Sequence, residues 1–152
     1  MNGRCLFATD YHGKRHRFEK LVTLIGETAP DIVFLGGDIL PGGGLFGEPV
    51  SPLHTDFIGD YLVPLFLSLR ERMGHEYPLV LLIPGNDDPR VMEASFLAGA
   101  DAGAFTYLSG RTMEYRGILL AGYPYVPPTP FSLKDWERSE EHTSELQSPY
   151  VI

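Results

Sequence analysis

The chain has 152 residues, of which 43% are hydrophobic and 21% charged, and its formal net charge is −8. This composition is typical of one globular domain, or of part of a larger one, and the length allows a sizeable hydrophobic core. The acidic balance argues against nucleic acid as a main partner, because contacts to phosphate need a basic surface. A bound metal ion can still supply positive charge locally.

The chain shows no sign of a membrane or secretory protein. No apolar run approaches the length of a membrane span, and no signal-peptide pattern follows the first residues. Cys5 is the single cysteine, so an internal disulfide is excluded, and we predict that it is buried in a strand. These features favour a reducing, cytoplasmic location.

Short apolar runs alternate with longer segments of helical periodicity. The apolar runs predict strands at 5–8, 31–35, 79–83, 105–108, 111–116 and 118–121. Apolar side chains three and four positions apart predict helices at 14–28, 54–75 and 89–97. Strands that alternate with helices predict an α/β fold with parallel pairing.

Prolines and one acidic residue set the expected helix boundaries. Pro30 prevents the first helix from continuing, and its core-facing side chains are predicted to be Phe18, Leu21, Val22, Leu24 and Ile25. Pro64 lies inside the second helix and is expected to kink it. Asp88, followed by Pro89, has the form of an N-cap for the third helix.

The stretch 31–41 is central to the functional interpretation. Its apolar run predicts a strand buried on both faces, and Gly36 and Gly37 then break the strand directly before Asp38. The carboxyl ends of strands are where open α/β sheets place their ligands. A glycine turn capped by its own Asp side chain is the local alternative.

Two further predicted strands end in polar residues. Asp10 and His12 follow the strand at 5–8, and Asn86 and Asp87 follow the strand at 79–83. In a parallel sheet these ends share one edge with Asp38, so the side chains can converge. Alternation along an extended segment predicts that Asp10 and His12 point to the same side and reach one ion. Carboxylate, imidazole and amide oxygen suit Mn, Fe or Zn.

Asp10-x-His12, Gly37-Asp38 and Gly85-Asn86 resemble the first three motifs of the calcineurin-like metallophosphoesterase family. The resemblance covers about residues 4–137, and the segment 122–130 is similar to a bacterial branch. It implies a fold of two stacked sheets flanked by helices, of which this chain would supply mainly the first sheet and its helices.

The resemblance also implies an activity and a set of site residues. The family hydrolyses phosphate mono- or diesters, here a small phosphate ester, with two divalent ions and a hydroxide held between them. By resemblance, Asp10 and His12 bind the first ion, Asp38 bridges the two, and Asn86 binds the second.

This chain departs from the family pattern at two points. Asp87 stands where the family commonly has a histidine that acts as the acid, so Asp87 is the catalytic candidate. Ionised, it would repel a phosphate ester, whereas protonated it could donate to the leaving oxygen. The family's later histidine ligands have no match, and we expect His16, His54 and His75 to lie on the surface.

Residues 138–148 match one reading frame of a short-read sequencing-library adapter. We therefore expect 1–137 to be the N-terminal part of a metallophosphoesterase domain and 138–152 to be a non-native, disordered tail. On this interpretation the chain itself is inactive. The alternatives are a non-catalytic fragment that binds at most one metal weakly, and a metal-free nucleotide-binding module. The latter lacks the Gly-Lys-Ser/Thr of a phosphate-binding loop.

Overall fold

The computed structural model describes residues 3–42, 56–128 and 135–138 of the chain. A four-stranded parallel sheet forms its centre, with the strands side by side in chain order. Its strands are β1 (Cys5–Ala8), β2 (Ile32–Leu35), β3 (Leu79–Leu82) and β4 (Thr106–Tyr107). The prediction of an α/β fold with parallel pairing is confirmed.

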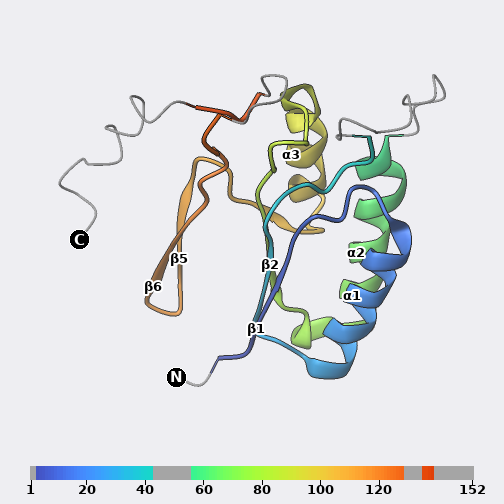
Figure 1. Ribbon diagram of the computed structural model, residues 1–152. Helices are drawn as coiled ribbons and strands as arrows, with labels where there is room; N and C mark the ends of the chain where they lie inside the picture. The colour runs from blue at the N-terminus through green and yellow to red at the C-terminus, as the bar shows by residue number, and fades with distance from the viewer. Residues whose placement is uncertain (1–2, 43–55, 129–134, 139–152) are drawn as a thin grey trace.

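The remaining elements lie on the two faces of this sheet. The helical elements are α1 (Arg15–Thr28), η1 (Phe57–Leu62), α2 (Val63–Met73), η2 (Gly74–Glu76), η3 (Arg90–Met92) and α3 (Glu93–Asp101). Strands β5 (Thr112–Tyr115) and β6 (Ile118–Ala121) form an antiparallel hairpin. Figure 1 shows α1 and α2 side by side on one side of the sheet and the hairpin on the other.

None of the helices in the described part of the chain combines the length and the apolar character that a membrane span needs.

The helix-covered face carries the larger core. Side chains alternate along each strand, so Val33, Leu35, Val80 and Leu82 point into the helices while their neighbours point the other way. Helix α1 buries Phe18, Leu21, Val22 and Ile25 against this face. Leu24, also predicted to face the core, is instead 42% exposed, because it lies at the margin of the apolar stripe.

Pro64 changes the type of the second helix. The chain runs as a π-helix through η1 and as an α-helix from Val63 onward, so Pro64 falls in the first turn of α2. Proline has no N–H to donate to the carbonyl four residues earlier, and its ring crowds that carbonyl. The wider π-turn, closed by a bond from the Val63 N–H to the Ile58 carbonyl, accommodates this gap. Residues 54 and 55 of the predicted helix lie outside the described residues.

The hairpin-covered face is only partly filled. Ile32, Leu81 and Leu108 form a small core there, next to a cavity of about 110 Å³. Phe7 borders this cavity and is 71% exposed. Cys5 is also exposed, which corrects the prediction of burial. Among the described residues β1 is the edge strand of the sheet, and Cys5, in register with Ile32, lies on this partly filled face.

Candidate metal centre

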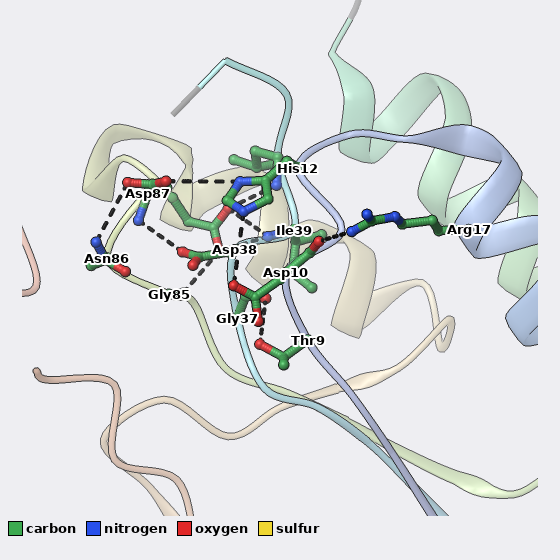
Figure 2. A network of polar contacts seen from close by, with 12 residues as sticks. Thr9, Asp10, His12, Arg17, Gly37, Asp38, Ile39, Gly85, Asn86 and Asp87 are labelled. Atoms are coloured by element: carbon green, nitrogen blue, oxygen red, sulfur yellow. Dashed lines mark hydrogen bonds and ion pairs between the residues drawn. The ribbon is translucent and has the colours of Figure 1, made fainter. Parts of the chain in front are cut away.

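Asp10, His12 and Asp38 meet at the carboxyl edge of the sheet, where β1 and β2 end. One ligand atom of each residue lies within 4.8 Å of those of the other two, and Figure 2 shows the three side chains turned toward one another. Asp10 is exposed, while His12 and Asp38 are half-buried. The structure therefore brings together three of the four residues predicted to bind metal.

The backbone that presents these residues is not extended. Asp10, His12 and Asp38 have φ angles of 61°, 47° and 53°, in the left-handed region that L-residues rarely adopt. The expectation that strand alternation aligns Asp10 with His12 was therefore wrong, although the two side chains do converge. Local strain of this kind concentrates at functional sites, and three of the five non-glycine residues with positive φ in the described chain are these three.

Backbone hydrogen bonds join the turn at 10–13, after β1, to the turn at 37–39, after β2. The N–H groups of Asp10, His12 and Gly13 donate to the carbonyls of Gly37, Asp38 and Ile39, at 3.2, 2.8 and 2.9 Å. These bonds continue the pairing of β1 with β2 beyond the ends of the strands. They fix the spacing of the candidate ligands before any ion is bound.

The turn after β3 lies directly against Asp38. The Asp87 N–H donates to Asp38 Oδ1 at 2.9 Å, and the Asn86 amide nitrogen lies 3.4 Å from Asp87 Oδ1 (Figure 2). A side chain on Gly85 would collide with Asp38, because a Cβ there would lie 2.3 Å from the Asp38 nitrogen. Glycine is thus required for this close approach.

The carboxylates of the cluster lie close to the His12 imidazole and to one another. His12 Nε2 lies 3.9 Å from Asp10 Oδ1, and His12 Nδ1 lies 3.8 Å from Asp87 Oδ2. Burial raises the pKa of Asp38, and the nearby carboxylates of Asp87 and Asp10 raise it further, whereas the Asp87 N–H and His12 oppose the shift. A divalent cation would relieve this crowding of negative charge.

Asp88 does not act as the predicted N-cap. Its side chain is fully buried and accepts hydrogen bonds from the backbone N–H groups of Ile39, Leu40 and Gly85. The N–H of Arg90, at the start of η3, is instead satisfied by the side chain of Asp135 at 2.8 Å. Burial raises the pKa of Asp88, and the three N–H groups oppose that shift because they stabilise the ionised form.

Comparison with known proteins agrees with this geometry. The family model for calcineurin-like phosphoesterases matches residues 3–144. The chain belongs to this family. No curated protein matches the chain significantly.

Two solved structures share the metallophosphoesterase-like fold. One crystal structure superposes with a TM-score of 0.61 at 19% identity, over 96% of this chain and 63% of its own. The crystal structure of TT1561 of Thermus thermophilus gives a TM-score of 0.55 at 15% identity, over 97% of this chain and 64% of its own. The chain thus spans less than two thirds of either structure, and identities this low show the fold alone.

The histidines predicted to lie on the surface do so where the structure describes them. His16 on α1 and His75 in η2 are both exposed. His54 and His142 lie outside the described residues. Within the described ranges, Asp10, His12 and Asp38 form the one cluster of acidic, histidine or cysteine side chains that could hold a metal ion.

Two residues that support the candidate site were not predicted from the sequence. Asp88 was assigned to a helix terminus because an Asp-Pro pair is typical of an N-cap, but its partners Ile39 and Leu40 are 49 and 48 residues away. Arg17, on α1, donates to the backbone carbonyl of Asp10. The Asp88 contacts leave no signal in the local sequence, because they depend on how two turns remote in sequence meet in space. The Arg17 contact spans only seven residues, and it depends on how α1 follows the turn at 10–13.

Proposed function

We propose that this chain carries metal-binding residues of a phosphate-ester hydrolase. Asp10 and His12 hold one divalent cation, Asp38 bridges to a second, and Asn86 binds the second. The observation that carries the proposal is the convergence of ligand atoms from Asp10, His12 and Asp38 within 4.8 Å, in a chain of the calcineurin-like phosphoesterase family. The substrate is a small phosphate mono- or diester.

The donor set fits Mn, Fe or Zn. Carboxylate oxygens and an imidazole nitrogen are hard to borderline ligands, which suit these ions better than copper. Bound divalent cations would supply Lewis-acid chemistry and neutralise charge on the phosphate. The chain's own contribution is to hold the ligands in place. The Asp87 N–H fixes one oxygen of Asp38, and the backbone hydrogen bonds between the turns at 10–13 and 37–39 fix His12.

We further propose that Asp87 faces the leaving group. Its side chain is 11% exposed and lies between His12 and Asn86 at the same edge of the sheet. A carboxylate there repels a phosphate ester when ionised and can donate a proton only when protonated, so the site favours esters whose leaving oxygen needs no acid.

The role of Asp87 predicts a dependence on the leaving group. If the parent protein hydrolyses aryl phosphodiesters, Asp87→His should raise its kcat most for the substrates with the most basic leaving oxygens. An acid contributes more to the rate for such substrates. The measurement is the slope of log kcat against leaving-group pKa. A uniform change across all the substrates would contradict the assignment.

A non-catalytic role is the second candidate. The described residues provide three clustered ligands and Asn86, while the exposed His16 and His75 add none. Such a set would bind one ion weakly and leave the chain without hydrolytic activity.

Replacing Asp38 tests the proposal. Asp38→Asn removes the charge shared by both cations, and we expect Mn²⁺ affinity, measured by calorimetry, to fall by about tenfold or more. Asp101→Asn, an exposed carboxylate at the end of α3, is the matched control and should leave affinity unchanged. Two equivalents of Mn²⁺ with hydrolysis of an aryl phosphodiester favour the enzyme, and one equivalent without hydrolysis favours the second candidate. Equal Mn²⁺ affinity in the parent and in Asp38→Asn would refute the metal site.

A further inference from the structure

Asp88 is a fully buried carboxylate that the proposed chemistry does not use. Its Oδ1 accepts from the N–H groups of Ile39 and Leu40 at 2.9 and 2.8 Å, and its Oδ2 accepts from Gly85 at 2.8 Å. A buried carboxylate is expensive unless it is hydrogen-bonded, and here backbone N–H groups on two separate turns satisfy it. Asp88 therefore links these two turns.

The residues that Asp88 binds are the immediate neighbours of the candidate metal ligands. Ile39 and Leu40 follow Asp38, and Gly85 precedes Asn86. The linkage is reciprocal, since the Asp38 carboxylate accepts from the Asp87 N–H while the Asp88 carboxylate accepts from the N–H groups after Asp38. Each turn thus supplies a carboxylate to the backbone of the other.

This linkage matters because the backbone at Asp38 is strained. Asp38 has a φ of 53° and Gly37 a φ of 100°, and strained conformations persist only where surrounding contacts impose them. The bonds from Asp88 to the next two N–H groups are such contacts. Without them, the Asp38 side chain would lose its fixed direction.

A second contact holds Asp88 itself. Trp136 is 2% exposed, and its Nε1–H donates to the backbone carbonyl of Asp88 at 2.6 Å. The guanidinium of Arg90 lies over the Trp136 ring, with its central carbon 4.8 Å from the ring centroid. The short segment 135–138 therefore fixes the turn after β3 from outside the site.

We propose that Asp88 is a positioning residue for the metal centre: by binding the backbone on both turns, it aims Asp38 and holds Asn86 beside it. This inference rests on the proposed function and deepens it. Partners that orient metal ligands typically contribute tenfold to a hundredfold to metal affinity, even though they do not touch the ion.

Asp88→Asn separates positioning from mere stability. Asparagine has one acceptor oxygen and an NH₂ group, so it cannot accept on both sides, and its donors would face the backbone N–H groups. We expect Mn²⁺ affinity, measured well below the unfolding temperature, to fall by about tenfold or more. Hydrogen exchange at the amides of Ile39, Leu40 and Gly85 should also become faster.

Asp31→Asn is the matched control. Asp31 accepts the backbone N–H of Arg4 at 2.9 Å and pairs with Arg116, but it lies at the other end of β2, before the strand rather than after it. This variant also loses a carboxylate acceptor for a backbone N–H, and its Mn²⁺ affinity should stay within about twofold of the parent.

The Mn²⁺ affinities of these variants test the positioning role of Asp88. If Asp88→Asn folds and keeps parental Mn²⁺ affinity, or if Asp31→Asn loses as much, Asp88 has no positioning role. If Asp88→Asn does not fold, Trp136→Phe, which removes the indole N–H bond to Asp88, should weaken Mn²⁺ binding by about threefold, and parental affinity would overturn the inference. If the parent chain itself binds no Mn²⁺, the proposed function fails and this inference fails with it.

Discussion

The two faces of the four-stranded sheet are covered very differently. On the helix-covered face, Phe18, Phe66, Leu69 and Leu82 are at most 1% exposed. On the face toward the hairpin, Phe7 is 71% exposed beside a cavity of about 110 Å³. Because free energy of burial scales with the apolar area removed from water, the helix-covered face supplies most of the stability of this molecule.

The candidate metal centre is anchored on the well-packed face. Tyr11, between Asp10 and His12, is 7% exposed, and the centroid of its ring lies 4.2 Å from that of the Phe18 ring. Ile39, directly after Asp38, is fully buried in the same core. The turns after β1 and β2 therefore depend on the helices rather than on the hairpin.

Two side-chain truncations, one on each face, test this dependence. Their effect on the free energy of unfolding should be the largest among these predictions. Phe18→Ala should lower the free energy of unfolding by about 3–5 kcal/mol, because it opens a cavity in the helix-covered core. Leu120→Ala, on the half-filled hairpin face, should lower it by about 1 kcal/mol. Urea denaturation measures both.

Mn²⁺ affinity sharpens the same test. Phe18→Ala removes the ring beneath Tyr11 and should weaken binding, whereas Leu120→Ala should leave it unchanged. If Leu120→Ala weakens binding as much as Phe18→Ala, the anchoring of the site on the helix-covered face is wrong.

The apolar pattern of each strand could be predicted from the sequence. The properties that depend on the order of the strands and on contacts between distant turns could not. Short apolar runs that end in Gly37-Asp38 and Gly85-Asn86 identified the parallel strands and the edge where the candidate ligands meet. The exposure of Cys5 could not be predicted, because an edge strand has the same local pattern as an inner one. The cross-turn role of Asp88 could not be predicted either, because its partners are remote in sequence.

The left-handed turns explain another limit of prediction. Asp10 and His12 converge through two rare backbone conformations rather than through strand alternation. Contacts between the turn at 10–13 and the turn at 37–39 impose such φ values, and they form only once β1 and β2 lie side by side.

A smaller effect on stability should appear at alkaline pH, and it arises from Tyr107 in the core of the helix-covered face. Burial raises the pKa of Tyr107 to about 12, from an ordinary value near 10. The unfolded chain then loses this proton at lower pH than the folded chain, so stability is complete below pH 10 and falls as the pH rises toward 12. Burial also raises the pKa of Tyr77, which acts in the same direction.

Tyr107→Phe is the variant that checks this pH dependence. It removes the ionisable group, so the decline in unfolding free energy between about pH 10 and 12 should become shallower. Urea titrations at a series of pH values measure the slope. An identical slope in the parent and the variant would show that Tyr107 ionises equally in both states.

Trp136 gives this molecule a built-in optical reporter. It is the only tryptophan of the chain, and its indole is bonded to the backbone of Asp88 beneath the guanidinium of Arg90. All intrinsic tryptophan emission therefore arises beside the turn that carries Asn86, in surroundings that exclude water. Any rearrangement of that turn changes the environment of a single fluorophore, so the state of the site can be followed by light without a label.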